Sequence, residues 1–290
     1  MKKSLFLFVF MICSAVMMGQ TDAKESWYFK LGGSYFVQAT ATEFPSVNGR
    51  EPLKQVYEGG KLVSKESITG SFGEGFRTGL GVGYRFTDRL GAEMGINYYT
   101  SNSKTMVETI SQGTTVLSAK GQVKAFDLAP ALVLYLGKVK GFEPYTKVGV
   151  IVPVDGKLDI KTNAISGGAV ITRKDVIKPN PTVGFLAALG TSYKLGKNLS
   201  AFGEIEYRNF TVHGKEKEVT EYTINGNDAL GSLSTAERYT NYVERLDSNS
   251  NASIDPNNPK TIDSTRPTDD LSSYISISGI GLTLGIRYSL

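Results

Sequence analysis

The segment 278–290 of the chain alternates strictly between two kinds of side chain. Because successive side chains of a β-strand point to opposite faces, this pattern predicts one strand with an apolar face and a small or polar face. A soluble sheet can alternate in the same way, so the rest of the chain must decide what the apolar face contacts. That face consists of Ile280, Leu282, Leu284, Ile286, Tyr288 and Leu290.

Seven earlier segments repeat the alternation, which makes eight predicted strands. Each is long enough to cross a bilayer as a tilted strand, which needs about 9–11 residues. Pro130 interrupts the fourth segment and predicts a bulge or local bend there. Phe202 breaks the pattern of the seventh, because it falls among the polar positions. The seven segments cover residues 27–38, 76–86, 90–98, 126–136, 142–152, 183–195 and 199–208.

The connections between these strands alternate in length. Three are tight turns, at residues 87–89, 137–141 and 196–198. Short and long connections alternate strictly, which is typical of an up-and-down meander with every short turn at one end. Strand-like pieces in the third and fourth long connections predict hairpins that extend the sheet. The four long connections cover about residues 40–75, 101–122, 155–180 and 211–273.

The character of the two faces separates a membrane barrel from a soluble one whose apolar face points inward. The polar face is mostly glycine, alanine and serine, which suits the crowded interior of a narrow barrel. The apolar face carries aromatic residues at both ends, such as Trp27 and Phe142 at one and Tyr35 and Phe126 at the other. Two aromatic girdles match the two interfaces of a bilayer. We therefore predict an all-β fold, an eight-stranded antiparallel up-and-down transmembrane β-barrel.

The N-terminal residues 1–19 are predicted to be a cleaved signal peptide. Lys2 and Lys3 precede an apolar run at residues 5–18, the arrangement of a secretory signal. Cys13, the one cysteine of the chain, falls inside it, so we expect no disulfide and no cysteine–zinc site in the mature protein. The mature chain, 20–290, is predicted to be a single barrel domain. A dispersed net charge of +4 gives no indication of a nucleic-acid partner.

The signal peptide, the eight alternating segments, the loop asymmetry and the terminal Tyr288-x-Leu290 resemble the small bacterial outer-membrane barrels related to the OmpA transmembrane domain and OmpX. The resemblance covers about residues 25–290. It implies location in the outer membrane, contact with its lipid, and assembly by the barrel-assembly machinery through the C-terminal strand. It also implies that the long loops are extracellular. Leu290 stands where the family usually has Phe or Trp, and no peptidoglycan-binding domain is expected after the barrel.

The predicted inner face carries charged residues of both signs. Ionised groups in a narrow lumen must pair or be hydrated, so we expect a structural ladder of ion pairs, although the pairs themselves depend on the shear of the barrel. The alternative role is a gate that opens a small pore. The barrel-interior charges are Lys30, Arg77, Arg85, Glu93, Asp127, Glu143, Lys147, Glu204, Glu206, Arg208 and Arg287.

Three motifs could indicate other chemistry. Gly79-x-Gly81-x-Gly83 lies within a strand and predicts space inside the barrel rather than a nucleotide site. His213 is followed by Gly214 and Lys215 and is expected to be a solvated loop residue, so no catalytic residue is assigned. One weak calcium candidate has the spacing of an oxygen-ligand loop, but Ala252 replaces the turn glycine. Its residues are Asp247, Asn249, Asn251 and Asp255. A plain polar loop is the preferred interpretation, and no metal or cofactor is expected.

The sequence thus predicts a non-enzymatic integral outer-membrane protein. Its long surface loops would serve interaction, adhesion or envelope integrity, with an extracellular ligand that the sequence does not name. The alternative function is a narrow gated pore or an OmpW-like transport of small molecules. A lateral route of that kind needs an apolar lumen, whereas the lumen predicted here is charged.

Overall fold

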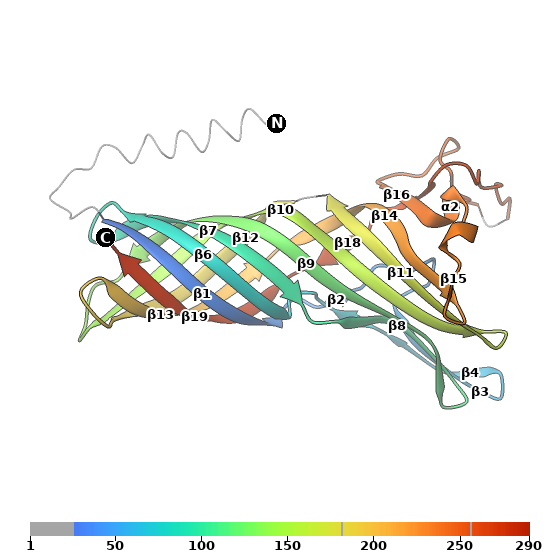
Figure 1. The fold of residues 1–290 in the computed structure, drawn as a ribbon, viewed down its shortest axis with the longest axis horizontal. Coiled ribbons are helices and arrows are strands. Elements are labelled where there is room, and N and C mark those ends of the chain that lie inside the picture. Colours follow the sequence, from blue (N-terminus) through green and yellow to red (C-terminus); the bar gives the residue numbers. More distant parts are fainter. Residues whose placement is uncertain (1–25, 181, 256) are drawn as a thin grey trace.

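The computed structural model describes residues 26–180, 182–255 and 257–290, so the predicted signal peptide and Cys13 lie outside the described residues. Eight antiparallel strands form a closed barrel in which each strand pairs with the next and the last pairs with the first (Figure 1). The predicted fold class is confirmed. The barrel strands are β1 (Ser26–Gln38), β6 (Gly75–Arg85), β7 (Leu90–Ser101), β9 (Thr114–Tyr135), β10 (Phe142–Ser166), β12 (Gly184–Lys194), β13 (Leu199–Asn209) and β19 (Gly279–Ser289).

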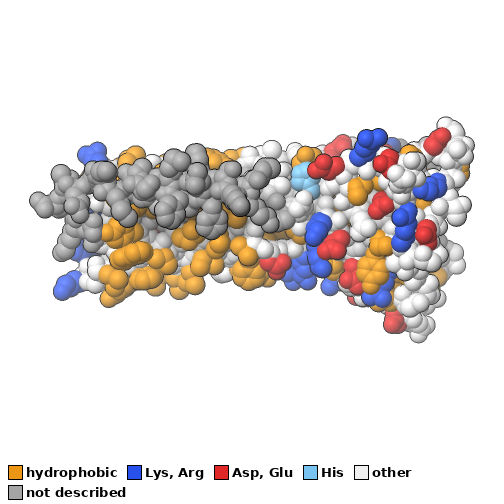
Figure 2. Space-filling view, turned by 90° about the horizontal axis from the view of Figure 1, so that it is seen from above, with side chains coloured by type: hydrophobic (Ala, Val, Ile, Leu, Met, Phe, Trp, Pro, Cys, Tyr) orange, Lys and Arg blue, Asp and Glu red, His pale blue; other side chains and the backbone are white. Residues whose placement is uncertain are grey.

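The alternating C-terminal segment, β19, closes the barrel between β1 and β13. Its register is continuous in both ladders, and Leu284 lies between Gly33 of β1 and Gly203 of β13. Leu284 is 61% exposed, whereas the neighbouring Thr283 is 5% exposed and faces the lumen. The five alternating apolar side chains of β19 and the following Leu290 all lie on the outer surface. Figure 2 shows the hydrophobic side chains of the visible face gathered over one half of the molecule and most of the charged ones over the other half, with a few basic side chains at the opposite end.

Aromatic side chains pair across neighbouring strands at both ends of this apolar band. Trp27 stands opposite Tyr84 near the short turns, with ring centroids 4.9 Å apart. Tyr98 stands opposite Phe126 near the long connections, at 4.7 Å. Such pairs stabilise a sheet and form the girdles that flank the lipid-facing band.

Pro130, where a bulge or local bend was expected, interrupts the ladder of β9 and β10 without changing its register. The register of β7 and β9 is unchanged across Pro130, which has no N–H to donate to a ladder. A register shift occurs in β10, between Pro153 and Asp155. A bulge adds one residue to one strand and reverses which later side chains face inward. Lys147 therefore points inward before the bulge and Leu158 points inward after it.

Three short turns lie at one end of the barrel, at residues 86–89, 136–141 and 195–198. The first is closed by a hydrogen bond from the N–H of Phe86 to the C=O of Leu90, at 2.9 Å. The second places Gly141 at a φ of 86°, a left-handed conformation that favours glycine. Figure 1 shows these turns at the same end as the C-terminus.

At the other end the sheet continues beyond the apolar band. β9 has 22 residues and β10 has 25, so their outer halves form hairpins with β8 and β11. Hairpins thus extend all four long connections, not only the third and fourth. The added strands are β2 (Thr42–Glu43), β3 (Leu53–Glu58), β4 (Lys61–Ser67), β5 (Thr69–Gly70), β8 (Lys104–Ser111), β11 (Ala169–Asn180), β14 (Thr211–Ile224), β15 (Asn227–Asp228), β16 (Tyr239–Val243), β17 (Thr268–Leu271) and β18 (Tyr274–Ser276).

Two short helical segments, η2 (Leu230–Ser232) and α2 (Thr235–Arg238), precede β16. Ser234 caps α2: its side chain accepts from the N–H of Glu237, and Glu237 reaches back to the N–H of Ser234. Throughout the part of the chain that the structure describes, helices are too short or too polar to span a bilayer.

Candidate functional site

The lumen holds all eleven charged residues that the sequence places on the inner face. Ten of them are buried, and Arg85 is half-buried. Each of the eleven has at least one partner of opposite charge within 4.0 Å. They form three groups stacked along the barrel axis, one in the middle and one toward each end.

Four side chains form a neutral ring in the middle of the lumen. Lys30 of β1 and Lys147 of β10 alternate with Glu93 of β7 and Glu204 of β13, so that each ammonium contacts both carboxylates. Lys30 Nζ lies 3.2 Å from Glu93 and also contacts Glu204. Lys147 Nζ lies 3.2 Å from Glu93 and 2.9 Å from Glu204. The ring connects four strands across the lumen.

Two tyrosines satisfy further acceptor positions of the ring. Tyr28 Oη donates to Glu93 Oε2 at 3.2 Å, and Tyr145 Oη donates to Glu204 Oε1 at 2.8 Å. Hydrogen bonds of this kind are needed before a buried ion pair becomes favourable, because each charge has lost its hydration.

Phe202, which breaks the alternation of its segment, lies inside the lumen against the ring. The Nζ of Lys30 is 4.1 Å from the centroid of its aromatic ring, a cation–π contact. Gly32 and Gly285 make room for it, since a Cβ on Gly285 would lie 2.7 Å from the phenylalanine ring. The irregular residue therefore fills the volume that two glycines leave.

The second group lies toward the long connections. Arg77 binds Glu206 through both terminal nitrogens, at 2.6 and 2.9 Å. Arg208 Nη2 lies 2.7 Å from Asp127 Oδ1, which also accepts from Asn97 at 2.8 Å. Two arginines thus balance two carboxylates, with the planar fork of Arg77 matched to one of them.

The third group lies toward the short turns. Arg85 and Arg287 share Glu143, at 2.7 and 3.4 Å. Arg287 also lies over the ring of Tyr28, at 4.2 Å, and Arg85 lies over the ring of Tyr135, at 4.0 Å. The two aromatic faces supply the stabilisation that a second carboxylate would otherwise provide.

These three groups leave little free space in the membrane-spanning part of the lumen. A cavity of about 50 Å³ remains beside the central ring, lined in part by Lys30, Arg77, Glu93 and Glu204. Since a water molecule needs about 10–15 Å³ of space open to a water-sized probe, this cavity has room for only a few waters. The arrangement suits a rigid core of ion pairs.

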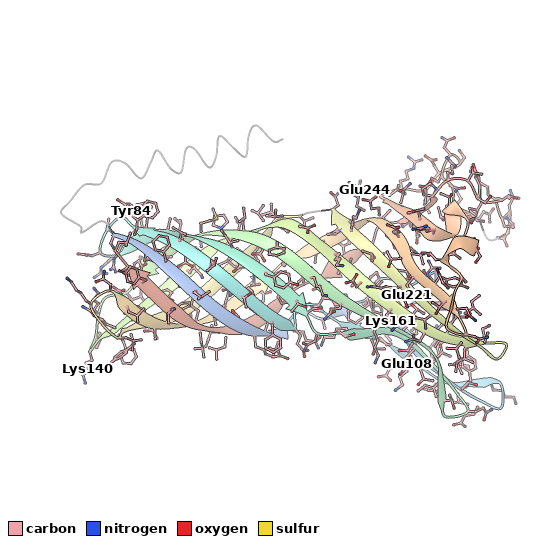
Figure 3. All side chains as sticks on the ribbon, in the orientation of Figure 1. Tyr84, Glu108, Lys140, Lys161, Glu221 and Glu244 are labelled. Carbon is pink, nitrogen blue, oxygen red and sulfur yellow. The ribbon has the colours of Figure 1, made fainter. Side chains whose placement is uncertain are left out.

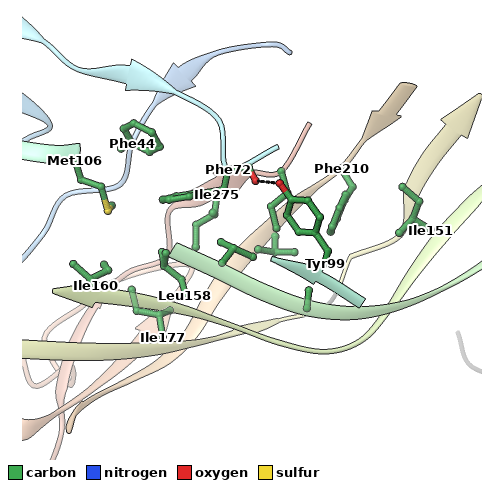
Figure 4. Packing of buried hydrophobic residues seen from close by; sticks show 14 of the residues in the cluster. Phe44, Phe72, Tyr99, Met106, Ile151, Leu158, Ile160, Ile177, Phe210 and Ile275 are labelled. Carbon is green, nitrogen blue, oxygen red and sulfur yellow. Dashed lines mark hydrogen bonds between the residues drawn. The ribbon is translucent and has the colours of Figure 1, made fainter. Parts of the chain in front are cut away.

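The outer part of the lumen is apolar, so the prediction of a charged lumen is wrong there. Figure 4 shows its buried side chains, including Phe72, Tyr99, Leu158 and Phe210. Tyr99 Oη donates to the C=O of Phe72 at 2.6 Å. Beyond the girdle the outward residues become polar and the inward ones apolar, because water replaces lipid outside the barrel. The residues of the first long connection help to fill this space.

A pocket of about 180 Å³ opens within this apolar region, and we call it the apolar chamber. Its lining includes Val123, Leu158, Ile177, Phe210, Ile275 and Ile277. It lies where β10 changes partner: β10 pairs with β12 as far as Ile151 and with β11 only from Leu158. The chamber lies between these two ladders, where residues 153–157 of β10 form part of its lining.

The polar side chains of the calcium candidate bind their own loop. Asn251 is 1% exposed, donates to the carbonyls of Asp263, Arg266 and Pro267, and accepts from the N–H of Asp263. Asp247 and Asp255 each accept an N–H two residues along. Hydrogen bonds from Thr265 lower the pKa of Asp263 below its ordinary value. No group of three or more His, Cys, Asp and Glu able to hold a metal occurs among the described residues.

His213 lies on β14, where its ring packs against Tyr274 with centroids 4.0 Å apart. It is half-buried rather than solvated in a loop. The sequence also left several uncharged members of the lumen network unassigned, although strict alternation places each on the inner face. They are Tyr28, Ser34, Asn97, Tyr145, Phe202 and Thr283.

Comparison with known proteins gives one family. A family model described as "Outer membrane protein beta-barrel domain" matches residues 6–234, and no curated protein sequence matches the chain. Among solved structures, Neisserial surface protein A (NspA) is 10% identical with a TM-score of 0.37, and the match covers 90% of this chain and 96% of that one. OprG from Pseudomonas aeruginosa is 14% identical with a TM-score of 0.42, over 92% and 96% of the two chains. E. coli Outer Membrane Protein W is 11% identical with a TM-score of 0.35, over 93% and 100%.

Proposed function

Because this chain belongs to the outer membrane protein beta-barrel domain family, we propose that it is a non-enzymatic outer-membrane protein whose extracellular hairpins bind a partner at the cell surface. The barrel would place the short turns in the periplasm and the hairpins outside. Its lumen of paired charges serves as a rigid support. The same protruding sheet could serve adhesion or hold neighbouring envelope components together.

One observation carries this proposal: apolar side chains are exposed at hairpin tips far from the lipid-facing band. Leu62 and Val63 of β4 are 46% and 53% exposed, and Ile165 and Val170 at the tip of the β10–β11 hairpin are 46% and 51% exposed. Contiguous apolar surface in contact with water marks interaction sites, and Ile165 and Val170 stand directly opposite each other in the ladder of β10 and β11. The strands beneath them are paired, so the tips are held in place.

The proposal is tested by removing these side chains from the cell surface. The variant Leu62→Ser/Val63→Ser/Ile165→Ser/Val170→Ser is expected to keep wild-type abundance and heat-modifiable migration, because all four positions are exposed. We expect it to lose adhesion of cells to an epithelial monolayer, or, if the partner is in the envelope, to become sensitive to detergent. Lys61→Gln/Lys65→Gln, at the same hairpin, is the control. Wild-type adhesion together with wild-type detergent resistance would contradict the proposal.

A second candidate, transport of small apolar molecules, is favoured by the apolar chamber. The chamber is lined by residues 153–157 of β10, at the side of the barrel, whereas the paired charges occupy the route along the axis. Ile177→Trp would fill the chamber and is expected to reduce binding of an apolar fluorescent dye at least several-fold. Ile165→Trp, at an exposed hairpin tip, should bind dye as the wild type does. Equal dye binding by all three proteins would exclude the chamber as a binding site.

A further inference from the structure

Lysines gather on the outward face of β9, β10 and β11, just beyond the apolar band. We call Lys120, Lys124, Lys157, Lys161 and Lys174 the lysine patch. The register places them directly opposite one another: Lys124 faces Lys157, Lys120 faces Lys161, and Lys161 faces Lys174. Figure 2 shows basic side chains where the hydrophobic surface ends, and Figure 3 labels Lys161 in the part of the barrel beyond it.

This arrangement works against folding unless an anion is present. Like charges directly opposite in an antiparallel sheet are destabilising. Asp159 contacts Lys157 at 3.5 Å, but among the described residues no carboxylate forms a salt bridge with the other four members of the patch. The adjacent Lys178 does have a partner, Glu216 of β14, at 3.8 Å. Glu221 stands opposite Lys174 in the ladder of β11 and β14, and Asp155 lines the same groove as Lys124 and Lys157. Five lysines thus face three nearby carboxylates, counting Asp159, and the patch keeps a net positive charge.

Protection of a sheet edge does not account for these lysines. Lysine commonly blocks edge strands from pairing with other chains. β9 and β10 are interior strands at this level, since β9 pairs with β8 and β10, and β10 pairs with β9 and β11. Another physical reason for the cluster is needed, and the nearest source of negative charge is the membrane surface.

The patch has two levels relative to the bilayer. Lys124 lies two residues beyond Phe126 of the outer girdle, about 7 Å along the strand, which is within the polar headgroup layer of roughly 5–8 Å. Lys120 and Lys161 lie four residues further, roughly another 13 Å along their strands. An outer groove of about 300 Å³, lined in part by Phe126, Lys124 and Lys157, connects the girdle to the first level.

We infer that the lysine patch binds the phosphorylated sugar headgroup of a glycolipid in the surrounding outer leaflet. One phosphate would lie against Lys124 and Lys157, and a second anionic group against Lys120, Lys161 and Lys174. A single phosphate does not span both levels, so an extended, multiply charged headgroup fits better than a simple phospholipid. Charge-assisted hydrogen bonds from lysine to phosphate supply the attraction. This lipid site needs no surface partner and goes beyond the proposed function.

The test measures glycolipid binding to the refolded full mature chain by native mass spectrometry. The probes are a bisphosphorylated acylated glucosamine disaccharide, the same lipid after dephosphorylation, and phosphatidylethanolamine. Lys124→Gln/Lys157→Gln is the patch variant. Lys61→Gln/Lys65→Gln removes the same charge from the β3–β4 hairpin and is the matched control. We expect the patch variant to bind the phosphorylated lipid about tenfold more weakly or worse, which corresponds to about 1.4 kcal/mol, and the control to bind as wild type.

Thermal unfolding in phosphatidylcholine vesicles provides a second measurement. Without glycolipid, the patch variant is expected to be at least as stable as wild type, because repulsion has been removed. When glycolipid is added, the unfolding temperature of the wild type is expected to rise more than that of the patch variant, since a ligand stabilises the state that binds it. Equal affinity of wild type and patch variant, or equal binding of the dephosphorylated lipid, would overturn the inference. The inference would also be overturned if a soluble sulfated polysaccharide bound to the patch more tightly than the phosphorylated lipid does. The patch would then serve a partner outside the membrane.

Discussion

Replacement of Leu284 by arginine is expected to lower the free energy of unfolding of the barrel in phospholipid vesicles by about 2–4 kcal/mol, the cost of a cation near the bilayer midplane on a lipid-facing strand. Leu284 lies in the middle of β19 and is 61% exposed. Its neighbours across the strands are Gly33 and Gly203, which offer no side chain to shield the charge. Equilibrium unfolding in urea, followed by the fluorescence of the single tryptophan, Trp27, measures the effect.

The control for this substitution is the adjacent, inward-facing residue. Thr283→Ser keeps the hydroxyl that contacts Ser34 at 2.7 Å and Arg77 at 3.1 Å, so its unfolding curve should nearly coincide with that of the wild type. If Leu284→Arg unfolds at the same urea concentration as wild type, the apolar face of β19 does not contact lipid.

Replacement of Glu204 by glutamine is expected to lower the free energy of unfolding by about 3–5 kcal/mol, because one partner of a buried ion pair is removed while the other stays charged. Lys30 and Lys147 would then share Glu93 alone. The double variant Lys147→Met/Glu204→Gln leaves one lysine with one carboxylate and should recover much of the loss. The same urea titration measures both.

The matched control makes the same chemical change on the surface. Glu216 lies 3.8 Å from Lys178 and is 49% exposed, and an exposed pair contributes about 1 kcal/mol or less. Glu216→Gln is therefore expected to unfold almost as the wild type does. A Glu204 variant as stable as this control would show that the central ring does not hold the barrel together.

The membrane-spanning part of the fold was predictable because one periodicity determines it. In β19, Leu282 and Leu284 had to face one way and Thr283 the other, and only lipid outside a narrow lumen suits those two faces. The same alternation identified the charged residues of the lumen. It did not identify which charges pair, because partners such as Arg77 and Glu206 are 129 residues apart in sequence and meet only through the shear of the closed barrel.

The outer half of the molecule was less predictable for a physical reason. In β9 the inward residues change from Asp127 to Ala125 and Val123, while the outward ones change from Phe126 to Lys124. Side chains still alternate with a period of two residues, but the polar residues now face outward and the apolar ones inward, because water replaces lipid around the barrel. These strands therefore lack the apolar outer face that marks a membrane strand. The bulge at Pro153–Asp155 shifts β10 by one residue as well. Both effects made paired strands resemble loops.

Single-channel recording on the refolded protein in planar bilayers tests the central claim most directly. An eight-stranded barrel encloses little more than its own side chains, and here the central ring of Lys30, Lys147, Glu93 and Glu204 crosses the lumen with only about 50 Å³ of free space beside it. The expected result is little or no steady conductance. Large, persistent single-channel currents from the wild-type protein would contradict the closed lumen and favour a pore.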